Sequence, residues 1–271
     1  MLTSRVVVAD SATQLDGRAA GAVVVTGSHG GAYPGELILA AGARAAVFND
    51  AAVGRDRAGI AALDHLERLG LPAAAVGHDT ARIGDGADML RRGVVRHANR
   101  QARALGCAPP LPCQTAVTLL AASPTQPANG RLTTIRGEAR HLMVDAVPQI
   151  WALDSAALAR ADDAGRILVT GSHGGLLGGD PASALRTEAA AAVYNDAGIG
   201  ADGAGLTRLP VLDRRDIPAA TVSAASARIG DGRSTYTDGV LSAANRTAAA
   251  LGAVPGMTTR AFVALVARAT R

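Results

Sequence analysis

The sequence predicts an α/β fold in which a duplicated unit, built on a parallel sheet, forms a pseudo-two-fold, two-lobed protein. The first observation is that TGSHGG occurs twice, at 26–31 and 170–175, each time after an apolar run. The second is that the match between the two halves extends well beyond this motif. The third is that short apolar runs alternate with helical patterns, which is typical of a doubly wound α/β sheet.

The duplication holds at two nearly constant offsets. The offset is 144 residues at the first motif, from Gly27 to Gly171, and 146 residues later in the chain, from Arg82 to Arg228. A second motif, ARIGDG, is also identical in both copies. We therefore expect a first repeat at 1–121, a connector at 122–148 and a second repeat at 149–271.

Apolar runs and their spacing predict the elements of each repeat. Between the third and fourth predicted strands, apolar residues recur every three positions from Ile60 to Leu69, and Gly70 follows, which predicts an amphipathic helix ended by a glycine. In the second copy, Asp180 and Pro181 predict a helix N-terminus. The strands predicted in the first copy lie at 5–9, 22–26, 45–48 and 72–76.

A long helix is expected after each ARIGDG motif. In the first copy its apolar stripe would include Val94, Ala98, Ala102 and Leu105. Asn99 and its equivalent Asn245 lie at the edge of this stripe, and we expect their amides to bond to loop backbone.

Composition excludes several classes of protein. The formal charge is +4, but the chain has no lysine and its basic residues are scattered arginines; with 2% aromatic residues, nucleic-acid binding is disfavoured. The two cysteines lack metal-site spacing, which favours a reducing compartment. No apolar segment is long enough for a signal sequence or a membrane span. We expect a cytoplasmic protein with a small-molecule substrate, no cofactor, no nucleic-acid or membrane partner, and possible homo-oligomers.

Polar residues follow every predicted strand of the first copy. Because the carboxyl ends of parallel strands lie along one edge of a sheet, these residues should meet at a ligand site there. The second copy repeats the arrangement, which predicts a crevice built from two lobes. The strand ends carry Asp10-Ser11, Ser28-His29, Asn49-Asp50 and His78-Asp79-Thr80 in the first copy, and Asp154-Ser155, Ser172-His173, Asn195-Asp196 and Ser226 in the second.

The TGSHGG loop contains the main catalytic candidates. His29 and His173 are candidates for general acid or base, with Ser28 and Ser172 as nucleophiles or hydrogen-bond donors. The alternative is that Ser and His only satisfy the amides of a tight turn. The glycines whose amides would hold a carboxylate, a phosphate or an oxyanion are Gly27, Gly30, Gly31, Gly171, Gly174 and Gly175.

The Asn-Asp pairs at the next strand end have two interpretations. Asp50 and Asp196 could orient an imidazole, as in a catalytic triad, while Asn49 and Asn195 bind substrate. The alternative is an Asx turn or a helix N-cap.

The arginines of ARIGDG also have two interpretations. Arg82 and Arg228 are suited to clamp a substrate carboxylate through two parallel hydrogen bonds. The alternative is an ion pair within each loop, to Asp85 and Asp231 respectively.

The copies differ at positions that bear on chemistry. His78 and Thr80 in the first copy, and Ser226 and Tyr236 in the second, are further candidates for substrate binding. A metal site formed by His78 and Asp79 with Asp10, Asp50 and His29 is a minority alternative, because no local metal-binding spacing supports it.

These patterns favour an enzyme that acts on a small carboxylate-bearing or otherwise anionic metabolite by His-assisted acid/base chemistry. Hydrolysis of an amide, imide or ester is the first expectation. One alternative is an isomerase, racemase or lyase that uses the two equivalent histidines on opposite faces of a substrate. The other is a non-catalytic protein that binds a small ligand.

Overall fold

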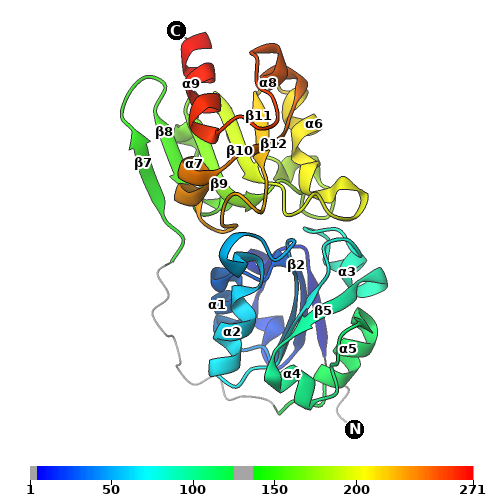
Figure 1. Cartoon of the computed structure of the whole chain (residues 1–271). Coiled ribbons are helices and arrows are strands. Elements are labelled where there is room, and N and C mark those ends of the chain that lie inside the picture. Colours follow the sequence, from blue (N-terminus) through cyan, green and yellow to red (C-terminus); the bar gives the residue numbers. More distant parts are fainter. Residues whose placement is uncertain (1–4, 125–136, 271) are drawn as a thin grey trace. The chain divides into compact units, whose positions relative to one another are not determined.

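The computed structural model describes residues 5–124 and 137–270 and contains two compact α/β units (Figure 1). The described residues of unit 1 are 5–53, 57–124 and 200–202, and those of unit 2 are 54–56, 137–199 and 203–270. Each unit therefore includes three residues that the other sequence copy encodes. The chain is an α/β protein of two similar halves, as its repeats predict.

Unit 1 contains a six-stranded sheet with its strands in chain order. The first four strands run parallel, and the last two are antiparallel to their neighbours. All four predicted strands are present. The strands are β1 (Val6–Ala9), β2 (Val23–His29), β3 (Ala45–Asn49), β4 (Ala73–Val76), β5 (Val94–Ala98) and β6 (Leu111–Pro112).

Unit 2 repeats the four parallel strands and differs at both edges of its sheet. Strand β7 adds an antiparallel partner to the first parallel strand, and β12 is antiparallel to the last one. A single bridge between Val240 and Thr258 stands where unit 1 has β6. The strands are β7 (Arg140–Val144), β8 (Ile150–Leu153), β9 (Ile167–His173), β10 (Ala191–Asn195), β11 (Ala219–Val222) and β12 (Leu241–Ala244).

The expectation of a wholly parallel, doubly wound sheet was wrong in part, because both sheets are mixed. The missed strand β5 lies where we expected a long helix. Helix α3 (Gly86–Arg92) ends at Gly93, and a Cβ atom there would clash with Met89 O. The apolar residues at helical spacing therefore belong to β5 and to the short helix α4 (Arg100–Ala104), which Asn99 begins.

Helices cover both faces of the unit 1 sheet. Val24 and Phe48 pack with α1 (Ala32–Ala40) and α2 (Ala61–Arg68). Val25, on the opposite face, packs with α3 and α5 (Cys113–Leu120). Because side chains alternate along a strand, neighbouring residues supply two separate apolar layers. The 3₁₀ helices in the first half of the chain are η1 (Ala12–Gln14), η2 (Gly17–Ala19) and η3 (Arg55–Ile60).

Unit 2 has the same two layers, but an irregular segment follows β9 where unit 1 has α1. Asp180 caps the short 3₁₀ helix η6 (Pro181–Ser183), which confirms the predicted N-terminus. The α-helices are α6 (Arg208–Asp213), α7 (Gly232–Asp238), α8 (Arg246–Ala250) and α9 (Thr259–Ala269), and the other 3₁₀ helices are η4 (Ala156–Leu158), η5 (Ala161–Asp163) and η7 (Ala201–Leu206).

Strand β7 lies inside the predicted connector 122–148. A buried ion pair links it to the rest of unit 2. Arg140 NH1 and NH2 lie 2.7 and 2.6 Å from the two carboxylate oxygens of Asp163, which is fully buried. Arg140 also stacks on Trp151, with its guanidinium carbon 5.0 Å from the ring centroid. The segment therefore forms an ordered part of the second unit.

Helices capable of crossing a bilayer are not found in the described parts of the chain, where every helix is too short or too polar.

Candidate functional site

The two motifs that are identical in both copies pack directly against each other. A Cβ atom on Gly27 would lie 2.5 Å from Asp85 N and 2.7 Å from Asp10 O, so only glycine fits. Gly84 N donates to Gly27 O at 2.8 Å. In unit 2, Gly230 N donates to Gly171 O at 2.7 Å in the same way. Close packing of backbone on backbone therefore explains part of the identity between copies.

The glycine amides after each His are already bonded within the loop. Gly30 N donates to Asn49 O at 2.9 Å, and Gly174 N donates to Asn195 O at 2.8 Å. Gly31 N donates to His29 Nδ1 at 3.0 Å. The equivalent contact, from Gly175 N to His173 Nδ1, is 3.2 Å long. An anion at these amides would have to replace the existing bonds.

The serines of the motif contact a different loop from the histidines. Ser28 Oγ accepts from Ala12 N at 2.9 Å, and Ser172 Oγ accepts from Ala156 N at 2.8 Å. The ring of His29 contacts Gly31, and consecutive residues of a strand point to opposite faces. The contacts of the described residues thus do not join Ser28 and His29 as a nucleophile and its base.

His29 is buried at the end of β2. Its exposed fraction is 9% and it lies beside Asn49 on β3. Burial lowers the pKa of His29 to about 4. The imidazole is therefore neutral near pH 7.

The asparagines of the Asn-Asp pairs are fully buried and bonded to backbone. Asn49 Oδ1 accepts from Ala51 N at 2.9 Å, and its Nδ2 donates to Ala81 O at 3.4 Å. Asn195 makes the matching contacts with Ala197 N and Ala227 O. The Oδ1 contacts are those of the Asx-turn alternative, and the Nδ2 contacts hold the ARIGDG loop beside the strand ends.

Asp50 joins two imidazoles at the carboxyl edge of the unit 1 sheet. Its Oδ1 lies 2.9 Å from His78 Nδ1 and accepts from His78 N at 2.9 Å. Its Oδ2 lies 3.6 Å from His97 Nε2. The Asp50 side chain is 6% exposed, against 28% for His78 and 34% for His97. A buried carboxylate thus holds two half-exposed imidazoles.

The charge of Asp50 is stabilised by these contacts. Burial by itself would raise the pKa of Asp50, but hydrogen bonds from the His78 side chain, the His97 side chain and the His78 amide outweigh burial and hold the pKa below its usual value. Asp50 is therefore an anion at neutral pH.

Unit 2 has the carboxylate without the imidazoles. Asp196 Oδ1 accepts from Gly198 N and Ala224 N at 2.8 and 2.9 Å, as Asp50 does from the equivalent backbone. Alanines at 224 and 243 stand in the positions of His78 and His97. The His-Asp-His cluster of Asp50, His78 and His97 therefore belongs to the first copy.

Thr80 and Ser226 occupy equivalent turns and bond to backbone. Thr80 Oγ1 donates to Gly77 O at 2.8 Å and accepts from Val94 N at 3.0 Å. Ser226 Oγ makes the same two contacts, with Ser223 O and Val240 N. Both hydroxyls link the turn to the next strand.

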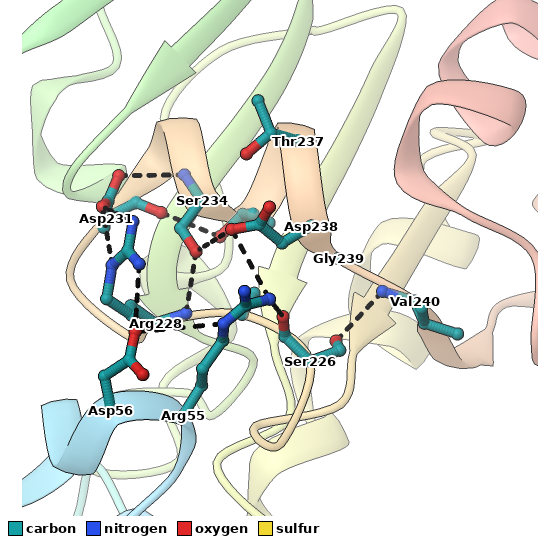
Figure 2. Close-up of polar contacts among 12 residues, drawn as sticks. Arg55, Asp56, Ser226, Arg228, Asp231, Ser234, Thr237, Asp238, Gly239 and Val240 are labelled. Carbon is teal, nitrogen blue, oxygen red and sulfur yellow. Dashed lines mark hydrogen bonds and ion pairs between the residues drawn. The ribbon is translucent and has the colours of Figure 1, made fainter.

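The arginines of ARIGDG form ion pairs. Figure 2 shows the guanidinium of Arg228 between two carboxylates, with NH2 3.0 Å from Asp231 and NH1 3.1 Å from Asp56. In unit 1, Arg82 NH2 lies 2.9 Å from Asp202 and its NH1 lies 3.9 Å from Asp85. The ion-pair alternative thus describes the observed contacts.

Asp56 and Asp202 were not predicted as partners of these arginines. They lie in the two segments, 54–56 and 200–202, that pack with the unit formed mainly by the other copy. Such a pairing is non-local, and no sequence pattern indicates it.

Tyr236 lies on α7 of unit 2. It packs against the core of unit 2 under α9, and Arg260 stacks on its ring at 5.5 Å. These contacts explain Tyr236 as a packing residue of α7.

Glu138 is a titratable residue that the sequence did not single out, because it lies in the predicted connector. Burial first, and then the neighbouring charge of Asp154, raise the pKa of Glu138 to about 7, although a hydrogen bond with Ser155 opposes them. Ala139 N donates to Asp154 Oδ2 at 2.9 Å and so brings Glu138 to the end of β8. His97 was missed for a similar reason, since β5 was expected to be helical.

The described residues contain no group of three or more His, Cys, Asp or Glu side chains arranged to hold a metal ion. No protein-family model, curated protein or solved structure matches the chain.

Proposed function

We propose that the chain is an enzyme that acts on a small anionic metabolite by His-assisted acid/base chemistry, with hydrolysis of an amide, imide or ester as the favoured reaction. The observation that carries the proposal is the 2.9 Å contact between Asp50 and His78 at the carboxyl edge of a parallel strand pair. Ligands of open α/β sheets bind outside this edge.

His78 is the proposed general base, and Asp50 orients it. The buried carboxylate holds His78 Nδ1, so an exchange of protons with a substrate would use Nε2. Asp50 stabilises the imidazolium that forms when His78 takes up a proton. The exposed fraction of the His78 side chain, 28%, leaves it within reach of a small molecule.

The preference for an anionic substrate comes from the two arginines of ARIGDG. Both guanidinium groups are partly exposed, at 46% for Arg82 and 40% for Arg228. A substrate carboxylate would compete with Asp85 and Asp202 for Arg82, or with Asp231 and Asp56 for Arg228. Such competition is feasible because exposed ion pairs are weak. The proposal includes the finer expectations of a cytoplasmic enzyme of small-molecule metabolism with a pseudo-two-fold relation between its lobes.

The contacts favour hydrolysis over an isomerase that uses His29 and His173 as paired bases. In both rings, Nδ1 already accepts a backbone hydrogen bond. The His-Asp pair is present in the first copy, which fits a single base better than two equivalent ones.

The test is turnover of a panel of small amides, imides and esters that carry a carboxylate, by the full chain and by variants. His78→Gln removes the base, and Asp50→Asn removes the charge but keeps an oxygen for the backbone amides. Each variant should lose about 100-fold or more in kcat/KM, the range that general acid/base groups contribute. His141→Gln, on β7, is the matched control and should retain activity.

Other outcomes would contradict the proposal. Full activity of a folded His78→Gln variant would show that His78 is not the general base. Solvent deuterium at a substrate carbon would indicate the isomerase or lyase alternative instead. Saturable ligand binding without turnover of any compound would indicate a binding protein.

A further inference from the structure

The loop after β2 fixes which nitrogen of His29 carries a proton. Gly31 N donates to His29 Nδ1 at 3.0 Å, and a ring nitrogen that accepts a hydrogen bond cannot itself be protonated. The proton of the neutral ring must then lie on Nε2. The 3.2 Å contact from Gly175 N gives His173 the same tautomer at the end of β9.

Protonation of Nδ1 is costly in this environment. A second proton would place two N–H groups, those of Nδ1 and Gly31, against each other in a site that is 9% exposed. Burial also disfavours the cationic ring, in line with its pKa of about 4. His29 therefore stays neutral across the physiological range.

Nε2 of His29 keeps a small solvent contact although the residue is buried. Hydrogen bonds within the described residues do not involve this atom, and it is not among their enclosed side-chain atoms that lack a partner. A polar atom that is neither bonded nor enclosed is accessible. Its N–H can therefore meet a ligand.

We infer that His29 is a neutral hydrogen-bond donor that binds a ligand oxygen through Nε2–H. The ligand class is a carbonyl, a carboxylate or the oxyanion that develops from a carbonyl during reaction. A neutral imidazole can polarise such an oxygen without giving up its proton. The two kinds of histidine then differ in role: His78 exchanges a proton, whereas His29 holds an oxygen.

The part of this inference that concerns reaction rests on the proposed function, but the tautomer and the binding of oxygen do not. Long-range proton–nitrogen NMR of the full, nitrogen-15-labelled chain distinguishes the two neutral tautomers and the imidazolium. We expect His29 and His173 in the Nε2–H form, with the His29 signals unchanged between pH 5.5 and 8, about one unit or more above its pKa. His29→Leu assigns the signals of that ring.

Sodium acetate is the probe for the ligand site, and sodium chloride of equal ionic strength is the control. Acetate should shift the Nε2–H resonance of His29 in a saturable way, and chloride should not. His29→Gln, which keeps a donor, and His29→Leu, which does not, extend the test to turnover: Gln should retain much more kcat/KM than Leu.

An Nδ1–H tautomer, protonation of His29 near pH 6.5, or equal responses to acetate and chloride would overturn the inference. These results do not depend on turnover. An inactive protein with the expected tautomer and acetate response would contradict the proposed function alone.

Discussion

In unit 1, the carboxylate of Asp50 contacts two imidazoles, whereas the contacts recorded for Asp196 in unit 2 are with backbone amides. The backbone around the two carboxylates is otherwise the same. The comparison shows that the shared carboxylate bonds to the backbone of the turn in both copies, while the two imidazoles beside it are present in the first copy alone.

A second difference lies in the segment that follows each TGSHGG motif. In unit 1 it forms α1, and Glu36 Oε1 lies 2.5 Å from His65 Nε2 on α2. In unit 2 the segment is irregular, and Arg208 takes the place of Ala62 on the following helix. Irregular backbone leaves carbonyl groups without helical partners, so a buried side chain must bond to them. The buried polar contacts beside this segment therefore differ: a Glu36–His65 pair in unit 1, and an arginine bonded to backbone carbonyls in unit 2.

The largest expected effect concerns an ion pair of unit 2. Asp163 stands at the position of Ala19 in unit 1, and both residues are fully buried. Asp163→Ala leaves Arg140 and Arg166 without their carboxylate and should cost about 3–5 kcal/mol of the free energy of unfolding. Chemical denaturation measures the loss. Asp162→Asn, at a residue 66% exposed, is the control and should change stability by about 0.5 kcal/mol or less.

The same ion pair predicts a dependence on pH. Burial alone would raise the pKa of Asp163, but hydrogen bonds with Arg140, the amide of Arg160 and Arg166 hold it below its usual value. Because the folded-state pKa is lowered, the stabilisation is fully present above about pH 4 and is lost as the pH falls further. The difference in stability between wild type and Asp163→Ala should therefore shrink in acid. A constant difference down to pH 2.5 would show that packing, not charge, causes the loss.

The next effect should be equal in the two units. Gly27→Ala and Gly171→Ala each force a Cβ atom against backbone of the ARIGDG loop and should cost about 3 kcal/mol. Gly17→Ala, with no atom within 4 Å of the added carbon, is the control. Thermal unfolding of all three variants gives the comparison. A loss in one unit alone would mean that the motifs are not structurally equivalent.

A smaller effect should be confined to unit 2. Arg208 Nε donates to Gly175 O at 3.0 Å, and its NH1 donates to Ser183 O and Ala184 O. Arg208→Met keeps the apolar stem but leaves these buried carbonyls without a donor, at a cost of about 2 kcal/mol. Arg246→Met removes an ion pair whose arginine is 91% exposed, and it should have little effect. Equal losses in the two variants would contradict the structural role of Arg208.

The sequence predicted the four parallel strands of each unit because each is an apolar run that ends in polar residues. It missed β5, since Val94 and Ala98 fall at helical spacing with later apolar residues although Gly93 stops the helix. It missed β7, because a lone antiparallel strand outside the repeat has no second copy to reveal it.

The candidate site was only partly predictable. The polar strand ends Asp50 and His78 were identified, but their contact depends on the exact turn after each strand. His97 reaches the same carboxylate from an antiparallel strand, and the pairing of Arg228 with Asp56 is non-local. Periodicity and motifs describe local structure, so contacts between distant segments have to come from the fold.

The smallest expected loss of stability concerns the equivalent N-termini of α9 and α5. Thr258 caps α9, with its side chain accepting from Ala261 N at 3.2 Å, whereas the equivalent Pro112 gives α5 no side-chain cap. Thr258→Ala should therefore cost about 1 kcal/mol, the usual loss of an N-cap. Thr237→Ala, an exposed change within α7, is the control. Phe262 and Val266 of α9 pack into the core of unit 2, so the loss should appear in the global unfolding of this unit. An effect limited to fraying of the helix end would mean that packing alone positions α9.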